Sequence, residues 1–153
     1  MMKRLAPLLL AFAFVMVFLS FVTPAVAAPD SCITYSGNDN DLNTTYPAYH
    51  WTKLDPAPAG THTVNLDGGK TITLVIVNTD GYTKVASWTS NTTIYKISVK
   101  GGTKYNLYSY TGGAMSDGTA NLVAPNNASG HPANISHITI GYTITTATPT
   151  LEP

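Results

Sequence analysis

Three features of the sequence predict the fold class. Apolar and polar residues alternate in short runs, β-branched and aromatic residues abound, and Gly-rich turns separate the runs at roughly 8 to 12 residues. Residues that favour exposed helix faces are scarce, so we expect no helix longer than one turn in the folded domain. The sequence therefore predicts an all-β protein, a single antiparallel β-sandwich of immunoglobulin-like or jelly-roll-like type.

The sandwich is expected to follow a secretory signal peptide. Residues 1–4 are a short basic head, residues 5–22 an almost unbroken apolar run, and residues 25–27 (Ala-Val-Ala) a cleavage site. A retained membrane anchor is the alternative, because the apolar run approaches the roughly 20 residues that span a bilayer. We predict cleavage after residue 27 and a protein that is secreted, extracellular or displayed at the cell surface.

The exported part, residues 28–153, carries little charge. It contains six Lys, no Arg, seven Asp and one Glu, with no cluster of either sign. Binding nucleic-acid phosphates or an anionic membrane needs a concentrated basic face, so we expect no nucleic-acid partner. We also expect no membrane insertion after signal cleavage. The length of 126 residues suits one domain with one core.

Each element is predicted from local pattern. Residues 28–45 are expected to form a loose N-terminal arm, residues 46–145 the sandwich, and residues 146–153 a Thr/Pro-rich tail. Two-residue alternation predicts strands over residues 49–54, 61–66, 70–77, 82–88, 93–100, 104–110 and 137–145.

Turn residues separate these strands. Gly or Asn marks turns at residues 67–69, 78–81, 90–91 and 101–102, and residues 111–133 are predicted as a long loop. The last strand has the clearest pattern. Its residues Ile138, Ile140 and Tyr142 share one face, and His137 lies on the other.

No catalytic constellation is evident, so we expect no enzyme activity, no catalytic residue and no cofactor. The four His residues lie at none of the usual metal-ligand spacings. The single Glu lies in the tail, so a glycosidase would need two Asp residues. A Gly-x-Ser-x-Gly nucleophile motif is absent. We expect His137 to be structural or solvated.

Residues Asp39, Asp41 and Asn43 offer oxygen atoms at alternate positions, as calcium-binding loops do. The loop lacks the Gly and Glu of an EF-hand, so a solvated turn is the alternative. They are a weak calcium candidate.

Aromatic residues give a second candidate site. A planar row of exposed rings would stack on sugars, and the candidates are Trp51, Trp88, Tyr108 and Tyr110. The alternative is that these rings fill the sandwich core, which we expect for most of the aromatic residues because they alternate with Ile and Leu. Because Tyr108 and Tyr110 lie on one face of one strand, we expect them to be the exposed pair.

Four Asn-x-Ser/Thr sequons are candidates for glycosylation, at Asn43, Asn91, Asn127 and Asn134. All four fall in predicted turns or loops, where an attached glycan is tolerated.

Five short motifs occur in a familiar order: 88–91 (Trp-Thr-Ser-Asn), 99–102 (Val-Lys-Gly-Gly), 106–110 (Asn-Leu-Tyr-Ser-Tyr), 124–127 (Ala-Pro-Asn-Asn) and 135–138 (Ile-Ser-His-Ile). Together they resemble a poorly characterised β-sandwich domain of secreted and cell-surface bacterial proteins. The resemblance implies an extracellular module without catalytic residues. Such domains tend to carry a cysteine where this chain has Gly141, which implies that Cys32 is the remaining half of a lost disulfide.

These observations predict a non-enzymatic, secreted or cell-surface structural and adhesive protein. Its partners would be other surface proteins, glycans or copies of itself. In one version, the N-terminal arm completes the sheet of a neighbouring subunit and builds an extracellular filament. A carbohydrate-binding module that uses the exposed Trp and Tyr residues is the alternative.

Overall fold

The computed structural model describes residues 27–144, so the predicted tail and all but the last residue of the predicted signal peptide lie outside the described residues. Within residues 27–144, helical structure is confined to two 3-10 turns, η1 (Asp39–Asp41) and η2 (Asp67–Gly69), and the four-residue helix α1 (Leu42–Thr45). The strands are β1 (Ser31–Ser36), β2 (His50–Leu54), β3 (Gly60–Leu66), β4 (Lys70–Thr79), β5 (Tyr82–Gly101), β6 (Lys104–Asp117), β7 (Leu122–Val123) and β8 (His137–Tyr142). The all-β prediction is confirmed.

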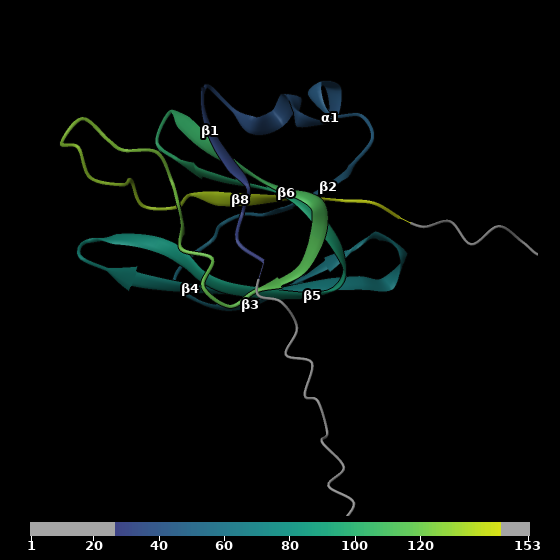
Figure 1. Ribbon diagram of the computed structural model, residues 1–153. Coiled ribbons are helices and arrows are strands. Elements are labelled where there is room, and N and C mark those ends of the chain that lie inside the picture. Colours follow the sequence, from purple (N-terminus) through teal and green to yellow (C-terminus); the bar gives the residue numbers. More distant parts are fainter. Residues whose placement is uncertain (1–26, 145–153) are drawn as a thin grey trace, which may run out of the picture.

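The strands lie in two layers that share two long strands (Figure 1). In what we call the upper layer, the order is β1, the first half of β6, the second half of β5, β8 and β2. In the lower layer, β3 pairs with β4, and β4 pairs with the first half of β5, which also pairs with β7 and the end of β6. All of these pairs are antiparallel, as expected for a sandwich.

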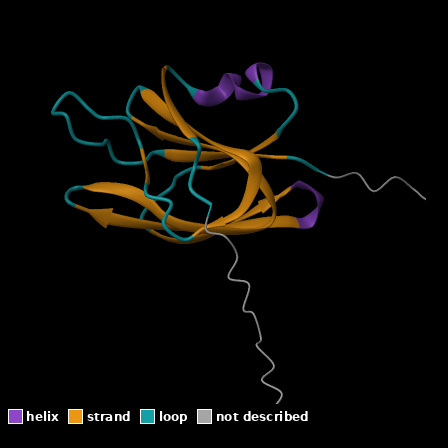
Figure 2. Cartoon of the chain, in the orientation of Figure 1, coloured by secondary structure: helices purple, strands orange, loops and turns teal. Residues whose placement is uncertain are grey.

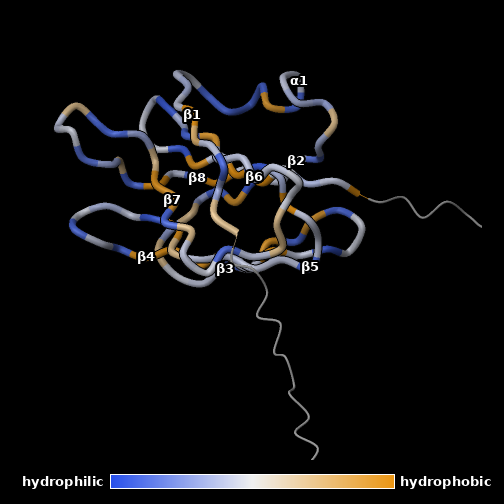
Figure 3. The backbone as a smooth tube through the Cα atoms, viewed as in Figure 1, coloured by the Kyte–Doolittle hydropathy of each residue, from blue (hydrophilic) through white to orange (hydrophobic). Residues whose placement is uncertain are grey.

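The core lies between the layers and follows the predicted alternation. Figure 3 shows hydrophobic stretches recurring along β4, β6, β7 and β8. Ile72, Leu74 and Ile76 of β4 are buried in the same hydrophobic cluster as Ile138 and Ile140 of β8. Burying an aliphatic side chain of this size contributes roughly 1.5–3 kcal/mol, so these positions supply much of the stability.

The turn between β4 and β5 follows from two residues, Asp80 and Gly81. Both have positive φ, 46° and 84°, and the flanking residues Thr79 and Tyr82 are paired. A two-residue connection with positive φ at both positions matches the twist of a hairpin, and Asp-Gly is a preferred sequence for it.

The predicted turn at Ser90-Asn91 is wrong, because β5 continues through these residues. The Ser90 Oγ donates to the Thr71 carbonyl oxygen at 2.8 Å, and the Asn91 Oδ1 accepts from the Thr71 N–H at 2.8 Å. Side chains thus satisfy the Thr71 backbone where β5 leaves the lower layer for the upper one. Turn-forming residues here produce a bend within one strand.

The predicted loop over residues 111–133 is also partly wrong. Strand β6 passes through Gly112 and Gly113 and ends at Asp117, and β7 follows. Gly113 has φ 80°, and a Cβ there would lie 2.1 Å from the Thr93 Cγ2. This glycine therefore lets β6 bend alongside β5 instead of ending the strand.

The N-terminal arm is not loose, which corrects the predicted boundary at residue 45. Residues 31–36 pair with residues 104–109 of the same chain as β1, at the edge of the upper layer. The segment after β1 lies over that layer, where Figure 2 shows the helical turns. The hypothesis of filament assembly depends on a free N-terminal arm, and residues 31–36 are already paired within their own sheet.

Candidate functional site

The outer face of the upper layer is covered by residues 37–49, which we call the cover segment. All six residues of β8 are buried, although only Ile138, Ile140 and Tyr142 contribute to the core between the layers. The alternating residues point to the opposite face, where the cover segment lies. A segment that belongs mostly to the predicted loose arm therefore gives the sheet a second buried side.

A buried carboxylate, that of Asp39 in η1, fixes the cover segment to the sheet. Its Oδ1 lies 2.8 Å from the His137 Nε2 and 3.4 Å from the Lys53 ammonium. Its Oδ2 accepts hydrogen bonds from the Ser98 hydroxyl at 3.0 Å and from the Thr139 hydroxyl at 2.6 Å. Three strands, β2, β5 and β8, thus converge on one side chain.

Burial raises the pKa of Asp39, but hydrogen bonds from Thr139, His137 and Ser98 and the charge of His137 outweigh it, bringing the pKa to about 2. The other ring nitrogen of His137 lies 3.9 Å from a carboxylate oxygen of Asp55. His137 thus lies between two carboxylates, in a structural network. The sequence predicts that His137 is structural or solvated, and the structure shows it buried against Asp39, a partner that the sequence does not reveal.

Aromatic side chains gather beside this network. The five partly exposed ones, which we call the aromatic face, are Tyr35, Tyr46, Tyr49, Trp51 and Tyr95. The ring centroid of Tyr49 lies 5.4 Å from that of Tyr95 and 6.2 Å from that of Trp51. The Lys96 ammonium lies 4.5 Å from the centre of the Tyr46 ring, a cation–π distance. Beneath them, Leu42 and Leu107 form a second buried cluster with Tyr105.

Three of the four candidate sugar-stacking rings are in the core, so that prediction is wrong for Trp88, Tyr108 and Tyr110. The Trp88 indole donates to the Tyr110 hydroxyl at 3.0 Å, which donates to buried Asp117 at 3.2 Å. The Tyr108 hydroxyl bonds both backbone groups of Val123 and so holds β7. In the first half of β6, Tyr108 and Tyr110 point into the core, whereas Tyr105 and Leu107 on the other face pack with Leu42 of the cover segment.

Only Trp51 of that set reaches the surface, and it is half-buried. Its indole packs over Gly141, which is its register partner in β8. A Cβ at Gly141 would lie 2.8 Å from the Trp51 Cζ3, so the glycine makes room for the ring.

The calcium candidate is wrong for Asp39, because both of its oxygens accept hydrogen bonds and the Lys53 ammonium would repel a cation. Asp41 and Asn43 are exposed. Within residues 27–144, no group of three His, Cys, Asp or Glu side chains is placed to hold a metal ion.

All four sequon asparagines, Asn43, Asn91, Asn127 and Asn134, are exposed. Glycosylation at these sites stays a prediction.

The disulfide implied by the resemblance does not fit this sheet. Cys32 lies in β1 and Gly141 in β8, with β6 and β5 between them. Three strand spacings separate the two positions by roughly 14 Å, whereas a disulfide joins Cα atoms about 4.4–6.8 Å apart. Cys32, which is exposed, is therefore not the remaining half of a bridge to position 141.

The surface has several hollows. A small one of about 170 Å³ lies beside Trp51 and Lys53. Two larger ones, of about 420 and 360 Å³, adjoin at the turn between β5 and β6 and share Lys104 and Asn126.

No protein-family model, curated protein or solved structure matches this chain. The resemblance to a bacterial surface domain therefore stays a prediction. Across residues 27–144, no helix is long and apolar enough to cross a bilayer.

Proposed function

We propose that this chain is a non-enzymatic, secreted or cell-surface structural and adhesive β-sandwich, which acts by contact through its aromatic face. The observation that carries the proposal is the gathering of five partly exposed aromatic side chains on the outer side of one layer. Tyr and Trp contribute much of the binding energy at protein interfaces, because each offers a large, rigid, amphipathic contact area.

The buried polar groups support the proposal of a structural protein. The Asp39 carboxylate is hydrogen-bonded to His137 of β8. The Asp117 carboxylate accepts hydrogen bonds from the Tyr110 hydroxyl and the Thr119 N–H. The Lys100 ammonium donates to the carbonyl oxygens of Gly37 and Gly102. These groups hold segments of the fold together, as expected of a scaffold that displays a surface.

The low net charge of the protein favours an uncharged polar partner. The exported part has a net charge of about −2, so long-range attraction to polyanions is weak. Partners recognised by tyrosine hydroxyls and ring faces, such as other surface proteins, glycans or a second copy, fit this composition.

A solid-phase binding assay tests the proposal. The signal-processed protein is titrated onto immobilised extracellular-matrix proteins, mucins, cell-wall preparations and itself. We expect saturable binding to at least one of them. Tyr49→Ser and Tyr95→Ser should each weaken it about tenfold, as loss of one interface aromatic does.

Tyr82→Ser is the matched control, because Tyr82 is also partly exposed but begins β5 in the lower layer. Circular dichroism of each variant confirms folding. Binding that survives both aromatic-face variants contradicts the proposed surface. Substrate turnover abolished by His137→Gln contradicts the non-enzymatic assignment.

A further inference from the structure

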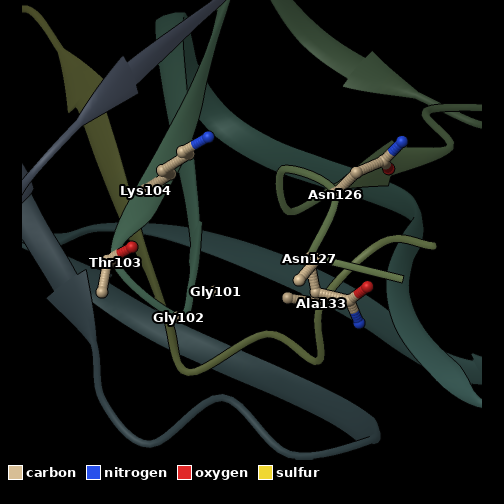
Figure 4. Close-up of a pocket in the computed structure, with 8 residues that line it drawn as sticks. Gly101, Gly102, Thr103, Lys104, Asn126, Asn127 and Ala133 are labelled. Carbon is tan, nitrogen blue, oxygen red and sulfur yellow. The ribbon is translucent and has the colours of Figure 1, made fainter. Parts of the chain in front are cut away.

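The turn between β5 and β6 borders a groove that no part of the proposal above uses. We call it the tip groove and define it as the two adjoining hollows of about 420 and 360 Å³. Both volumes fall in the range of roughly 300–1,000 Å³ that small-molecule sites occupy. Figure 4 shows Thr103 and Lys104 on one side, Asn126, Asn127 and Ala133 on the other, and Gly101 and Gly102 between them.

The walls of the tip groove are held in place by backbone hydrogen bonds. The Asn127 N–H donates to the His131 carbonyl oxygen at 2.8 Å, and the Ala133 N–H donates to that of Pro125 at 3.1 Å. On the floor, a Cβ at Gly101 would lie 2.7 Å from the Asn134 carbonyl oxygen, so only glycine fits there. A groove with fixed walls loses little conformational entropy when it binds a ligand.

The lining is rich in groups that both donate and accept hydrogen bonds. Asn126 and Asn127 have exposed amide side chains, and Thr34 and Thr103 supply hydroxyl groups. The Asn127 Oδ1 accepts from Ser129, which leaves its NH₂ group as a donor. Paired donors and acceptors of this kind match the neighbouring hydroxyl groups of a sugar ring.

The charge in the tip groove is positive. Lys104 is exposed and lines both hollows, and the lining contains no Asp or Glu. A second ammonium, that of Lys100, lies against the same turn, 2.7 Å from the Gly102 carbonyl oxygen. Within residues 27–144, neither lysine has a carboxylate oxygen within 4.0 Å. A carboxylate on the ligand would therefore find an uncompensated cation.

We infer that the tip groove binds a carboxylate-bearing oligosaccharide, with Lys104 contacting the carboxylate and Asn126 and Asn127 contacting ring hydroxyls. The inference goes beyond the adhesive function proposed above and uses a different surface. The groove offers no aromatic ring for stacking, so hydrogen bonds and one ion pair carry the recognition and the affinity is modest.

Amide chemical-shift titration of the signal-processed, unglycosylated protein tests the inference. The probes are trigalacturonate and sialyllactose, which carry the carboxylate in two different sugars, with the methyl esters of both as neutral counterparts. We expect saturable shifts at Gly101, Gly102, Asn126 and Asn127 with at least one acidic probe. Its neutral counterpart should bind about fivefold more weakly, the effect of one exposed ion pair.

Two variants with a matched control complete the experiment. Lys104→Gln should weaken binding of the acidic probe about fivefold and leave the neutral one unchanged. Lys70→Gln removes the same charge from an exposed position outside the groove and should have no effect. Thr103→Trp should block the groove.

Equal binding of acidic and neutral probes, or no effect of Lys104→Gln, overturns the assigned ligand class. No shift at the four groove residues with any probe overturns the site. Either result leaves the proposed adhesive function untouched, because that function is tested at Tyr49 and Tyr95, which lie outside the tip groove.

Discussion

The carboxylate of Asp39 and the imidazole of His137 lie 2.8 Å apart, although 98 residues separate them in the sequence. One belongs to a 3-10 turn near the start of the domain and the other to its last strand. Their contact closes the outer side of the upper layer and keeps the N-terminal segment on its own sheet.

Acid should weaken this contact. The pKa of Asp39 is about 2 in the folded protein, below the ordinary 3.8. Stability from this carboxylate is therefore fully present above about pH 4 and is lost as the pH falls toward 2, a loss of about 2 kcal/mol. Urea unfolding from pH 6 to pH 2 measures it.

The Asp39→Asn variant should lack that part of the pH dependence and be less stable at pH 6. Asp41→Asn, an exposed carboxylate of the same turn, is the control. Identical pH profiles for wild type and Asp39→Asn would show that the network does not stabilise the fold.

Trp51 and Gly141 should be energetically coupled. Gly141→Ala places a methyl group against the indole and should cost about 1–3 kcal/mol of unfolding free energy. With Trp51→Ala the clash disappears, so the double variant should be more stable than the sum of the two losses predicts, by about 1 kcal/mol. Strict additivity in a denaturation cycle would argue against this packing.

Gly112 and Gly113 offer a matched pair within β6. Both have positive φ, 78° and 80°, but only at Gly113 would a Cβ meet another atom, the Thr93 Cγ2. The strain of a positive φ is common to both alanine variants, whereas the steric clash arises only at Gly113. Gly113→Ala should therefore be the more destabilised, by about 1–3 kcal/mol. Thermal unfolding of the two variants measures the difference, and equal stabilities would contradict the bend as described.

Tyr110→Phe should destabilise the core by about 1–3 kcal/mol. It removes the hydroxyl that links the Trp88 indole to Asp117 and leaves both buried groups without that partner. Chemical denaturation measures the loss. Tyr95→Phe, on a half-exposed ring, should change stability little, and a similar loss in both variants would speak against a special role for Tyr110.

Much of the fold is predictable from local pattern. The alternation of Ile72, Leu74 and Ile76, and that of Ile138, Ile140 and Tyr142, places these residues in the core, where the structure has them. A two-residue period needs no information from distant parts of the chain.

The bends and the site depend on distant contacts, which no local pattern reveals. Ser90 and Asn91 are typical turn residues, but here their side chains bond Thr71 of the neighbouring strand. Periodicity shows that Tyr108 and Tyr110 share a face, but it does not show whether that face meets solvent or the other layer, so the prediction that they are exposed is wrong. The pairing of Asp39 with His137 needs the complete strand order.

The central structural claim is that the N-terminal segment belongs to its own sheet, and native-state hydrogen exchange tests it most directly. In the protein that begins at residue 28, the bonded amides of β1 should be protected far above the level of an unstructured peptide, because they pair with β6 in the upper layer. If the amides of residues 31–36 exchange as freely as those of an unstructured peptide, the segment is a free arm, and the covered sandwich described here is wrong.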